Sequence, residues 1–457
     1  MSLIVDRRNI DFLLYEFLDV EKLFATERYA AHDRAGVTAM LDSAEAIAEK
    51  HFQPLAAKLD ANEPKIVEGK VEIIPGVKEA LQAFAEAGFF ATVFDEADGG
   101  LQLPMSVHLL AAGIFQVANQ PIANYAFLTI GNANMLRAFG TEEQIARYMP
   151  PMLEGRWFGT MCLSEPQAGS SLSDITCKAE PLGDGTYRIS GSKMWISGGD
   201  HELSENIVHM VLAKIPGGPA GVKGISLFLV PKYLVNDDGS IGARNDLHCH
   251  SLEHKLGIHG SPTCTMIYGD GKYGDEAGAI GWLIGEENKG LACMFTMMNN
   301  ARLAVGMQGV AICEAATQKA VQYAKDRTQG KAPGWTGQGM SPIIEHPDVA
   351  RMLVTMKALT QGSRAICYVC AHATDMSHHA DGDEARHWAE RAALLTPIAK
   401  SFATDAGVDV ASLGIQTHGG MGFIEETGAA RYWRDSRIAP IYEGTNGIQA
   451  ADLVTRK

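Results

Sequence analysis

Ile441-Tyr442-Glu443-Gly444-Thr445-Asn446, near the C-terminus, is the stretch around which the sequence is organised. It places one carboxylate, Glu443, between an aromatic ring and a glycine. Because glycine has no Cβ, a ligand can approach the backbone closely at Gly444. The stretch suits a general base that removes a proton next to a carbonyl, although a Tyr-Glu-Gly triplet alone is more typical of a surface turn. Three stretches upstream favour the base.

The composition is that of a large globular protein. The 457 residues are 46% hydrophobic and 20% charged, which suggests two or three domains. The sequence has no apolar run of about 18 residues and its N-terminus lacks the order of a secretory signal, so we predict a cytoplasmic protein with no membrane partner. The formal net charge of −15 argues against a nucleic-acid partner.

Cysteine and histidine spacing gives little support to a metal site. The eight cysteines are scattered, which does not resemble a disulfide framework. Cys367 and Cys370 form a C-x-x-C inside an apolar helical run, and this is more typical of buried helix residues than of zinc or redox chemistry. The four histidines at 248, 250, 254 and 259 could suggest a metal, but no acidic or cysteine ligands recur at zinc spacing. We predict no metal.

The hydrophobic period divides the chain into an extension and three domains. Residues 1–35 form an N-terminal extension whose apolar side chains are expected to pack on the main body or on a partner subunit. Residues 36–155 have helical spacing, 156–280 contain short alternating or apolar runs, and 281–457 return to helical spacing. The predicted fold is α+β and multidomain, with an N-terminal helical domain, a middle antiparallel β domain and a C-terminal helical bundle.

Local signals place several elements within these domains. Thr141-Glu142-Glu143-Gln144 fits a capping box that opens a helix, and Pro150-Pro151 is expected to end it. Gly183-Asp184-Gly185 is typical of a hairpin turn. Strands are predicted over 207–215 and 225–230, and long helices over 291–329, 346–379 and 384–413.

Three stretches carry further chemistry. Small residues and hydroxyls in Met161–Ser170 leave backbone N–H groups free for a flat polar ligand or a phosphate. In Lys193–Gly199, Trp195 and Ser197 share one face of a strand, where a ring could cover a cofactor and a hydroxyl could bond its edge. Gln416–Phe423 ends a helix in a glycine loop that offers donors to a pyrophosphate. Taken singly, the three also fit an ordinary loop, a core tryptophan and a helix C-cap.

Taken together and in this order, the stretches resemble the acyl-CoA dehydrogenase family of flavoproteins. That family shows T/S-E-P-x-A-G-S, K-x-W-I-T/S-x-G, K-x-G-I/W-x-x-S-P-T, Q-x-x-G-G-x-G-F and I-Y-E-G-T. This chain carries the five motifs in the same order, at Ser164–Ser170, Lys193–Gly199, Lys255–Thr263, Gln416–Phe423 and Ile441–Thr445. The resemblance runs from about residue 36 to the end and implies the same three-domain fold.

The resemblance implies an FAD-dependent α,β-dehydrogenation of an acyl-CoA thioester to the enoyl-CoA. Glu443 would be the base for the α-proton, and the β-hydrogen would leave as hydride to flavin N5. The backbone N–H of Glu443 and a ribityl hydroxyl would stabilise the thioester oxygen. Burial between substrate and flavin should raise the pKa of Glu443 toward the working pH.

The resemblance also assigns binding residues. Those expected to hold FAD from the same chain are Met161, Leu163, Ser164, Gly169, Trp195, Ile196, Ser197, Thr445 and Asn446. Those expected at the pyrophosphate or adenine of a neighbouring subunit's FAD are Arg327, Gln416, Gly419 and Gly420. Those expected at the substrate are Ser170, Asn299, Arg302, Tyr442 and Gly444. Because the second set serves a neighbour, the resemblance implies an obligate homodimer or homotetramer.

Several positions depart from the family pattern. Ser171 and Asn299 stand where the family usually has aspartate. The usual R-x-x-F-G is Arg327-Thr328-Gln329-Gly330 here, and a loop rich in glycine and proline follows at about 331–345. These departures bear on the adenine end of the cofactor and not on the chemistry.

The N-terminal extension and Asn446–Leu453 look most like the methylthiopropanoyl-CoA (3-methylmercaptopropionyl-CoA) dehydrogenase subgroup. That likeness favours a short or thioether-containing acyl group, with a generic short- or medium-chain substrate as the alternative. The subgroup normally continues past the position of Lys457 with a further helical segment, so a truncated form and a form without that segment are both open.

Three classes of activity remain to be weighed. The leading one is a dehydrogenase that passes electrons to an electron-transfer flavoprotein. The second is an oxidase of the same fold, in which oxygen reaches the reduced flavin. The third is a catalytically idle member that binds nucleic acid, but such members carry a basic surface, whereas this chain is acidic and keeps Glu443.

Overall fold

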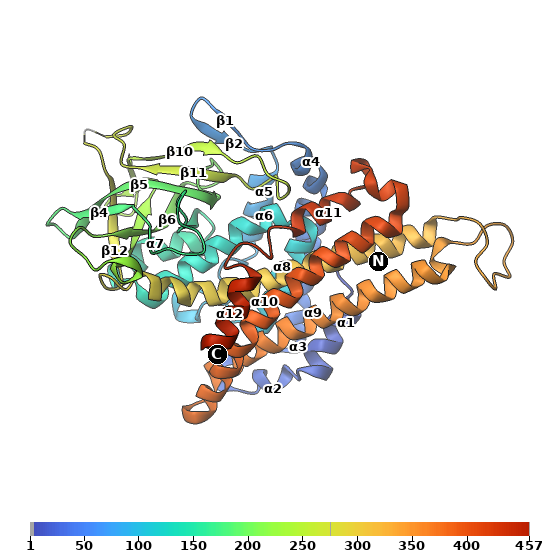
Figure 1. The fold of residues 1–457 in the computed structure, drawn as a ribbon. Coiled ribbons are helices and arrows are strands. Elements are labelled where there is room, and N and C mark those ends of the chain that lie inside the picture. Colours follow the sequence, from blue (N-terminus) through green and yellow to red (C-terminus); the bar gives the residue numbers. More distant parts are fainter. Residues whose placement is uncertain (1–3, 275, 457) are drawn as a thin grey trace.

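Helices, strands and again helices follow one another along the chain (Figure 1). The structure is a computed structural model that describes residues 4–274 and 276–456, except the side chains of 296–300. The sheet lies at one end of the molecule, and the long helices run side by side away from it (Figure 1). This arrangement confirms the predicted α+β fold.

The first group of elements is helical apart from one hairpin. Its helices are α1 (Arg7–Asp11), α2 (Glu21–Phe24), α3 (Arg34–Ile47), α4 (Ala56–Ala61), α5 (Val77–Glu86), α6 (Met105–Phe139) and α7 (Glu142–Leu153). A π-helical segment, Phe12–Phe17, joins α1 to α2. The helical spacing predicted for 36–155 is wrong at β1 (Lys65–Val67) and β2 (Lys70–Glu72), which pair antiparallel. Glu68 and Gly69 both have positive φ (49° and 78°), as a tight hairpin turn requires.

The N-terminal extension packs on the main body, as one of the two alternatives predicted. Ile10, Leu14 and Leu23 are buried in the same hydrophobic cluster as the side chains of α6. Asp6 accepts a hydrogen bond from the Lys357 ammonium at 3.3 Å, which adds a polar contact to α9 (Pro347–His379). Two aromatic residues of the extension are exceptions, because Phe12 stays 50% exposed and Phe17 54% exposed.

Helix α7 begins where predicted and ends later. The Thr141 hydroxyl accepts from the Gln144 N–H at 3.2 Å and the Gln144 side chain accepts from the Thr141 N–H at 2.9 Å, which confirms the capping box. The helix runs through Pro150-Pro151 to Leu153 instead of stopping at the prolines. Their carbonyls accept from the N–H groups of Glu154 and Arg156 at 3.0 and 2.9 Å, so both prolines belong to the last turn.

The middle elements form one eight-stranded sheet and a two-stranded ribbon. The strands are β3 (Trp157–Cys162), β4 (Lys178–Pro181), β5 (Thr186–Ser197), β6 (Asn206–Lys214), β7 (Ile225–Pro231), β8 (Tyr233–Val235), β9 (Ile241–Arg244), β10 (Leu247–Leu252), β11 (Thr263–Tyr268) and β12 (Ala279–Ile284). The large sheet has the order β10-β11-β5-β12-β7-β6-β3, and β4 pairs with β5 and β6. Most pairs are antiparallel, and the predicted turn at 183–185 joins β4 to β5.

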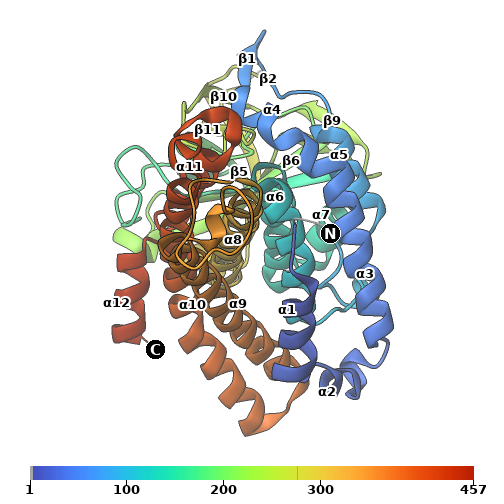
Figure 2. The ribbon, with the colours of Figure 1, turned by 90° about the vertical axis from the view of Figure 1, so that its right-hand side faces the viewer.

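The last group consists of long helices packed lengthwise. It contains α8 (Gly290–Asp326), α9 (Pro347–His379), α10 (Gly382–His418), α11 (Ala429–Ser436) and α12 (Asn446–Arg456). A buried ion pair between Arg364 of α9 and Glu314 of α8 ties two of these helices together. The final helix, α12, lies beside α10 in both views (Figures 1 and 2). None of the described helices is both long and apolar enough to cross a membrane.

Candidate active site

Glu443 lies in the segment between α11 and α12, in an unusual backbone conformation. Its φ is 53°, in the left-handed region that non-glycine residues seldom adopt, and Gly444 follows with φ 81°. Such a conformation costs on the order of 1–3 kcal/mol and persists only where the surroundings hold it. A Cβ at Gly444 would lie 2.7 Å from Nε2 of Gln449, so a larger residue there would push the Gln449 amide away from the segment.

Two positive side chains face the Glu443 carboxyl. Burial raises its pKa, and the Lys400 ammonium and the Arg302 guanidinium act in the opposite direction. Arg302 is only 3% exposed, and its Nη1 donates to Asp452 of α12 at 2.9 Å. A partly buried carboxyl with a raised pKa and nearby cations is suited to proton transfer.

The predicted substrate residues are divided between two places. Gly444 lies beside Arg302, whose Nη2 is 3.7 Å from where a Gly444 Cβ would stand. Tyr442 is anchored at its hydroxyl, which donates to Oε1 of Gln308. Ser170 is exposed on the loop after β3, and the Asn299 side chain lies outside the described residues.

The predicted flavin residues of the β domain meet at the ends of β3 and β5. Met161 is the penultimate residue of β3, and Leu163 and Ser164 follow the strand. The Met194 N–H donates to the Ser164 carbonyl at 3.0 Å. A buried ion pair fixes the two stretches, since Nζ of Lys193 lies 2.8 Å from Oε1 of Glu165 and both side chains are at most 1% exposed. Lys193 also donates to the Leu163 carbonyl at 3.0 Å.

Trp195 is turned out of the sheet beside this junction. The pairing of β5 with β11 shifts register between Lys193 and Ile196, and Trp195 has φ 61°. A β-bulge of this kind re-aims a side chain. The Trp195 side chain is therefore 55% exposed while Ile196 is buried, so the interpretation of Trp195 as a core residue is wrong.

These residues fit a flat aromatic cofactor. The exposed Trp195 ring lies next to Gly169, where an added Cβ would be 3.8 Å from the ring, so the loop comes close without a side chain between. Gly169 and Ser170 are exposed, and Ser197 ends β5 on the same side of the junction. A free indole face of this size next to open backbone is what an isoalloxazine ring requires.

Helix α6 connects the flavin junction to the Glu443 segment. A Cβ at Gly198 would lie 3.5 Å from the Tyr125 ring, so the end of β5 rests on α6. The neighbouring Asn124 accepts from Nε2 of Gln308 at 2.9 Å, and Gln308 in turn holds Tyr442. The chain of contacts shows that both predicted halves of the site converge on one turn of α6.

The residues predicted to reach a neighbouring subunit's FAD lie away from the Glu443 segment. Arg327 follows the last residue of α8 and Gln416 is in the last turn of α10, and both are exposed. At about 1.5 Å per residue, the 25 positions between Arg302 and Arg327 span about 37 Å of α8. No atom lies within 4 Å of an added Cβ at Gly419 or Gly420, so this glycine loop is open.

Thr445 and Asn446 are already engaged within the chain. The Thr445 hydroxyl accepts from the Ile448 N–H at 3.2 Å and so caps the start of α12. The Asn446 amide donates to Asp405 of α10 at 2.8 Å. These contacts join the base segment to the helices on either side of it.

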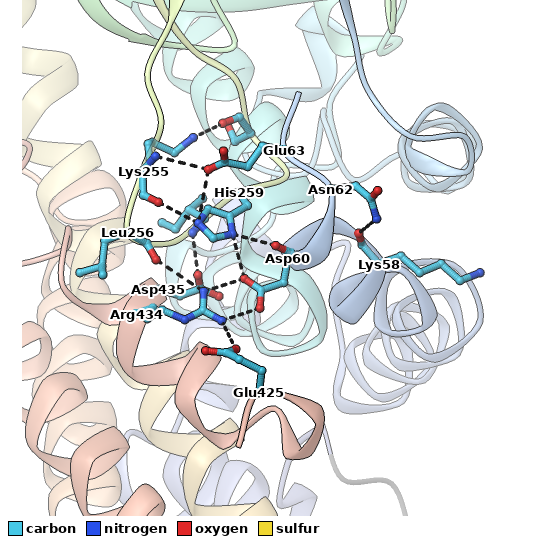
Figure 3. A network of polar contacts seen from close by, with 12 residues as sticks. Lys58, Asp60, Asn62, Glu63, Lys255, Leu256, His259, Glu425, Arg434 and Asp435 are labelled. Carbon is cyan, nitrogen blue, oxygen red and sulfur yellow. Dashed lines mark hydrogen bonds and ion pairs between the residues drawn. The ribbon is translucent and has the colours of Figure 1, made fainter. Parts of the chain in front are cut away.

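The Lys255–Thr263 motif is held by a network of polar contacts between three parts of the chain (Figure 3). Arg434 of α11 forms two bonds to Asp60 of α4, at 2.6 and 2.8 Å. His259 lies between Asp60 and Glu63, at 3.1 and 3.4 Å from their oxygens. A Cβ at Gly257 would be 2.6 Å from the Arg434 backbone, so only glycine lets α11 approach here.

This network accounts for two of the four grouped histidines. His259 bonds to Asp60 of α4, and His254 bonds to Glu63 in the segment that follows α4. Among the described residues, no three His, Cys, Asp or Glu side chains are grouped to hold a metal ion. Cys367 and Cys370 are buried in α9, as predicted.

Two cavities lie along α6 and share Gln116. The more apolar one is lined by Phe84, Phe89, Phe115, Phe127 and Ala304, among others. The other lies between α6, α8 and α11 and includes Gln120, Ala311 and Tyr432. The more apolar cavity also includes Ala123 and Ala126, which flank Asn124 and Tyr125 on α6.

Sequence reasoning missed the residues that hold the site together. Glu165 and Lys193 lie inside two quoted motifs but were given no role, and Lys400, Gln308 and Gln449 lie outside the assigned set. The available signal was a lone charge on a buried face, because Lys400 shares one side of α10 with the buried Thr396, Ala403 and Gly407.

Comparison with known proteins identifies this arrangement. Family models for the N-terminal, middle and C-terminal domains of acyl-CoA dehydrogenase match residues 36–156, 160–270 and 288–457. The chain is 44% identical over 98% of its length to 3-methylmercaptopropionyl-CoA dehydrogenase of Ruegeria pomeroyi, of which it covers 75%. It is 36% identical to a butyryl-CoA dehydrogenase of Syntrophomonas wolfei, with the same 98% and 75% coverage.

Solved structures show the same fold. The butyryl-CoA dehydrogenase of Megasphaera elsdenii matches with a TM-score of 0.72 and 25% identity, over 92% of this chain and 97% of that one. An acyl-CoA dehydrogenase complexed with FAD, from Bacillus anthracis, matches with a TM-score of 0.75 and 24% identity, over 93% of this chain and 67% of that one. The chain therefore belongs to the acyl-CoA dehydrogenase family, whose members are FAD-dependent oxidoreductases.

Proposed function

We propose that this enzyme dehydrogenates a short acyl-CoA between its α and β carbons, with Glu443 as the base that takes the α-proton. The observation that carries the proposal is the partly buried Glu443 carboxyl, with a raised pKa and with Lys400 and Arg302 facing it. A carboxylate whose pKa is raised is a stronger base than an ordinary one and so accepts a carbon-bound proton more readily. FAD, when bound, supplies the acceptor for the hydrogen that leaves the β carbon with its electron pair.

The remaining roles, which are to bind and orient the cofactor and the substrate, fall to other residues of the chain. Trp195 would cover one face of the flavin. The residues that would border the ring are Met161, Leu163, Ser164, Gly169, Ile196 and Ser197. The Glu443 backbone N–H donates to the thioester oxygen, where negative charge develops as the proton leaves. Arg302, fixed by Asp452, holds positive charge beside Gly444. Tyr442 is kept in place by Gln308 and lines the acyl site.

The set formed by Arg327, Gln416, Gly419 and Gly420 serves the FAD of a neighbouring subunit. Its distance from Arg302 along α8 supports this, because one extended cofactor would have to span most of the helix to touch both. The exposed Met421, Phe423 and Ile424 next to the glycine loop, of which Phe423 is 88% exposed, support a subunit interface there. We therefore propose a homodimer or homotetramer.

The substrate we propose is 3-(methylthio)propanoyl-CoA, with butanoyl-CoA as the second candidate. The 44% identical relative is named for the first and the 36% identical relative for the second. The aromatic cavity along α6 suits a short apolar acyl tail. We propose an electron-transfer flavoprotein as the acceptor, and the cytoplasm as the compartment, because all eight cysteines are free thiols.

Anaerobic mixing of the FAD-loaded protein with methylthiopropanoyl-, butanoyl-, octanoyl- and palmitoyl-CoA tests this proposal. We expect the two short esters to bleach the flavin at least about 10-fold faster than palmitoyl-CoA, because each unaccommodated methylene costs binding. Fast bleaching only by long chains would keep the reaction and overturn the short substrate. No bleaching by any ester, with FAD bound, would overturn the proposed function for these acyl classes. Admitting oxygen to the reduced protein separates the oxidase alternative, which predicts rapid reoxidation.

A further inference from the structure

We propose that Lys400 is the residue that positions Glu443 and compensates its charge. This inference rests on the proposed role of Glu443 as the base. Lys400 lies on α10, in the middle of a helix that supplies no residue to the motif around Glu443. Its side chain is fully buried, which lysine almost never is unless it is paired.

The Lys400 ammonium is bonded to the base segment at two points. Its Nζ donates to the Gly444 carbonyl at 2.9 Å and to Oδ1 of Asn446 at 2.9 Å. Gln449 of α12 donates to the carbonyls of Glu443 and Gly444 at 3.3 and 3.0 Å. The peptide groups on the C-terminal side of Glu443 are therefore fixed by one lysine and one glutamine.

This fixation explains how Glu443 keeps its left-handed backbone. A glutamate at φ 53° is held only if its neighbouring carbonyls are held. The Asn446 side chain extends the support, since it donates to the Thr404 hydroxyl at 3.1 Å and to Asp405 at 2.8 Å while it accepts from Lys400. Without the lysine, the segment loses its link to α10 at Gly444 and keeps only the Asn446 contacts.

The lysine also sets the charge around the base. Glu443 is faced by Lys400 from α10 and by Arg302 from α8. Lys400 is itself faced by Glu443, Asp405 and Arg302, and the pKa of its ammonium is lowered to about 8, chiefly by burial. Asp452 of α12 already neutralises Arg302. Lys400 is thus charged below about pH 8 and favours the ionised form of Glu443 there.

The test compares Lys400→Met, Lys400→Gln and the control Lys357→Met, all loaded with FAD. Lys357 is an exposed lysine of α9 whose ammonium lies 3.3 Å from the Asp6 carboxylate. With butanoyl-CoA, we expect Lys400→Met to lower the limiting rate of flavin reduction about 10- to 100-fold, with less than about 3-fold change in the substrate concentration at half-maximal rate. The control should stay within about 2-fold of the wild type.

The pH profile separates positioning from a merely structural effect. The titration of the base in the reduction rate should move to higher pH in both Lys400 variants, because Arg302 alone then opposes the burial of Glu443. Lys400→Gln keeps a hydrogen-bond donor but no charge. It should therefore recover part of the rate of flavin reduction, while the pH dependence of that rate stays shifted. If Lys400→Met fails to fold, Lys400→Gln carries the test.

Rates within about 2-fold of wild type and an unmoved profile, with FAD retained, would overturn the role of Lys400. Glu443→Gln, measured beside these variants, keeps the two proposals apart. If it reduces its flavin normally, the proposed function has failed. If it is inactive while the Lys400 variants behave as wild type, only the inference about Lys400 has failed.

Discussion

Glu443→Gln is expected to retain FAD and to lose flavin reduction by acyl-CoA, with a fall of at least about 10³-fold in the limiting rate. Glutamine has nearly the same shape and keeps the contacts of the segment, because Lys400 and Gln449 bond to backbone carbonyls and not to the Glu443 carboxyl. The carboxamide cannot accept a proton from carbon at neutral pH. Anaerobic stopped-flow absorbance with methylthiopropanoyl- or butanoyl-CoA measures the rate, and the flavin-to-protein absorbance ratio measures retention.

Two further variants serve as a control and as a conservative replacement. Glu390→Gln removes an exposed carboxylate from α10 and should leave the rate unchanged. Glu443→Asp keeps a carboxylate but places it one methylene farther from the substrate, so it should retain part of the rate of flavin reduction. Normal bleaching of the Glu443→Gln flavin would contradict the base assignment. Loss of FAD from that variant would show that the carboxyl has a structural role that the described contacts do not contain.

The sequence predicted the periodic parts of the fold well, because periodicity reports burial directly. The long helix expected at 291–329 is α8, and the strands expected at 207–215 and 225–230 are β6 and β7, each within a few residues. The β1–β2 hairpin could not be predicted in this way, since it is short and five of its six strand residues are exposed. A strand without a buried face shows no alternation of hydrophobic and polar residues in the sequence.

The candidate site was predicted as separate stretches, and its connections were not. The motifs around Trp195 and Glu443 are recognisable because their residues must suit a cofactor and a substrate. Asn124 and Gln308 connect them in space, but each is one polar residue in an apolar helix. Lys400 lies 44 positions from the carbonyl it holds, and no local pattern reports a contact at that distance.

The pair Lys193–Glu165 gives the second large prediction, because it is buried and joins both flavin stretches. Glu165→Leu leaves the Lys193 ammonium without its carboxylate in a site that is fully shielded from water. Removing one partner of a buried pair typically costs about 3–5 kcal/mol of stability. We expect a loss of that order in the free energy of unfolding by urea, together with release of FAD on gel filtration, since Ser164 and Trp195 are positioned through this pair.

The acid dependence of the wild type follows from the same contact. Burial alone would raise the pKa of Glu165, but the Lys193 ammonium and the N–H groups of Thr176 and Cys177 outweigh it and lower the pKa to about 2 from its usual 4.5. A lowered carboxyl pKa stabilises the fold above the unfolded value, so this contribution is complete above about pH 4.5 and is lost as the pH falls toward 2. In Glu165→Leu the corresponding part of the acid dependence should be missing.

An exposed ion pair is the matched control for Glu165→Leu. Glu154 and Arg156 lie 2.7 Å apart, with their side chains about half exposed. Glu154→Leu should change the free energy of unfolding by no more than about 0.5–1 kcal/mol and leave FAD bound, because solvent screens such a pair. If Glu165→Leu behaved like Glu154→Leu in both measurements, the buried pair would not be what holds the flavin stretches together, and the backbone bond from Met194 to Ser164 would have to suffice.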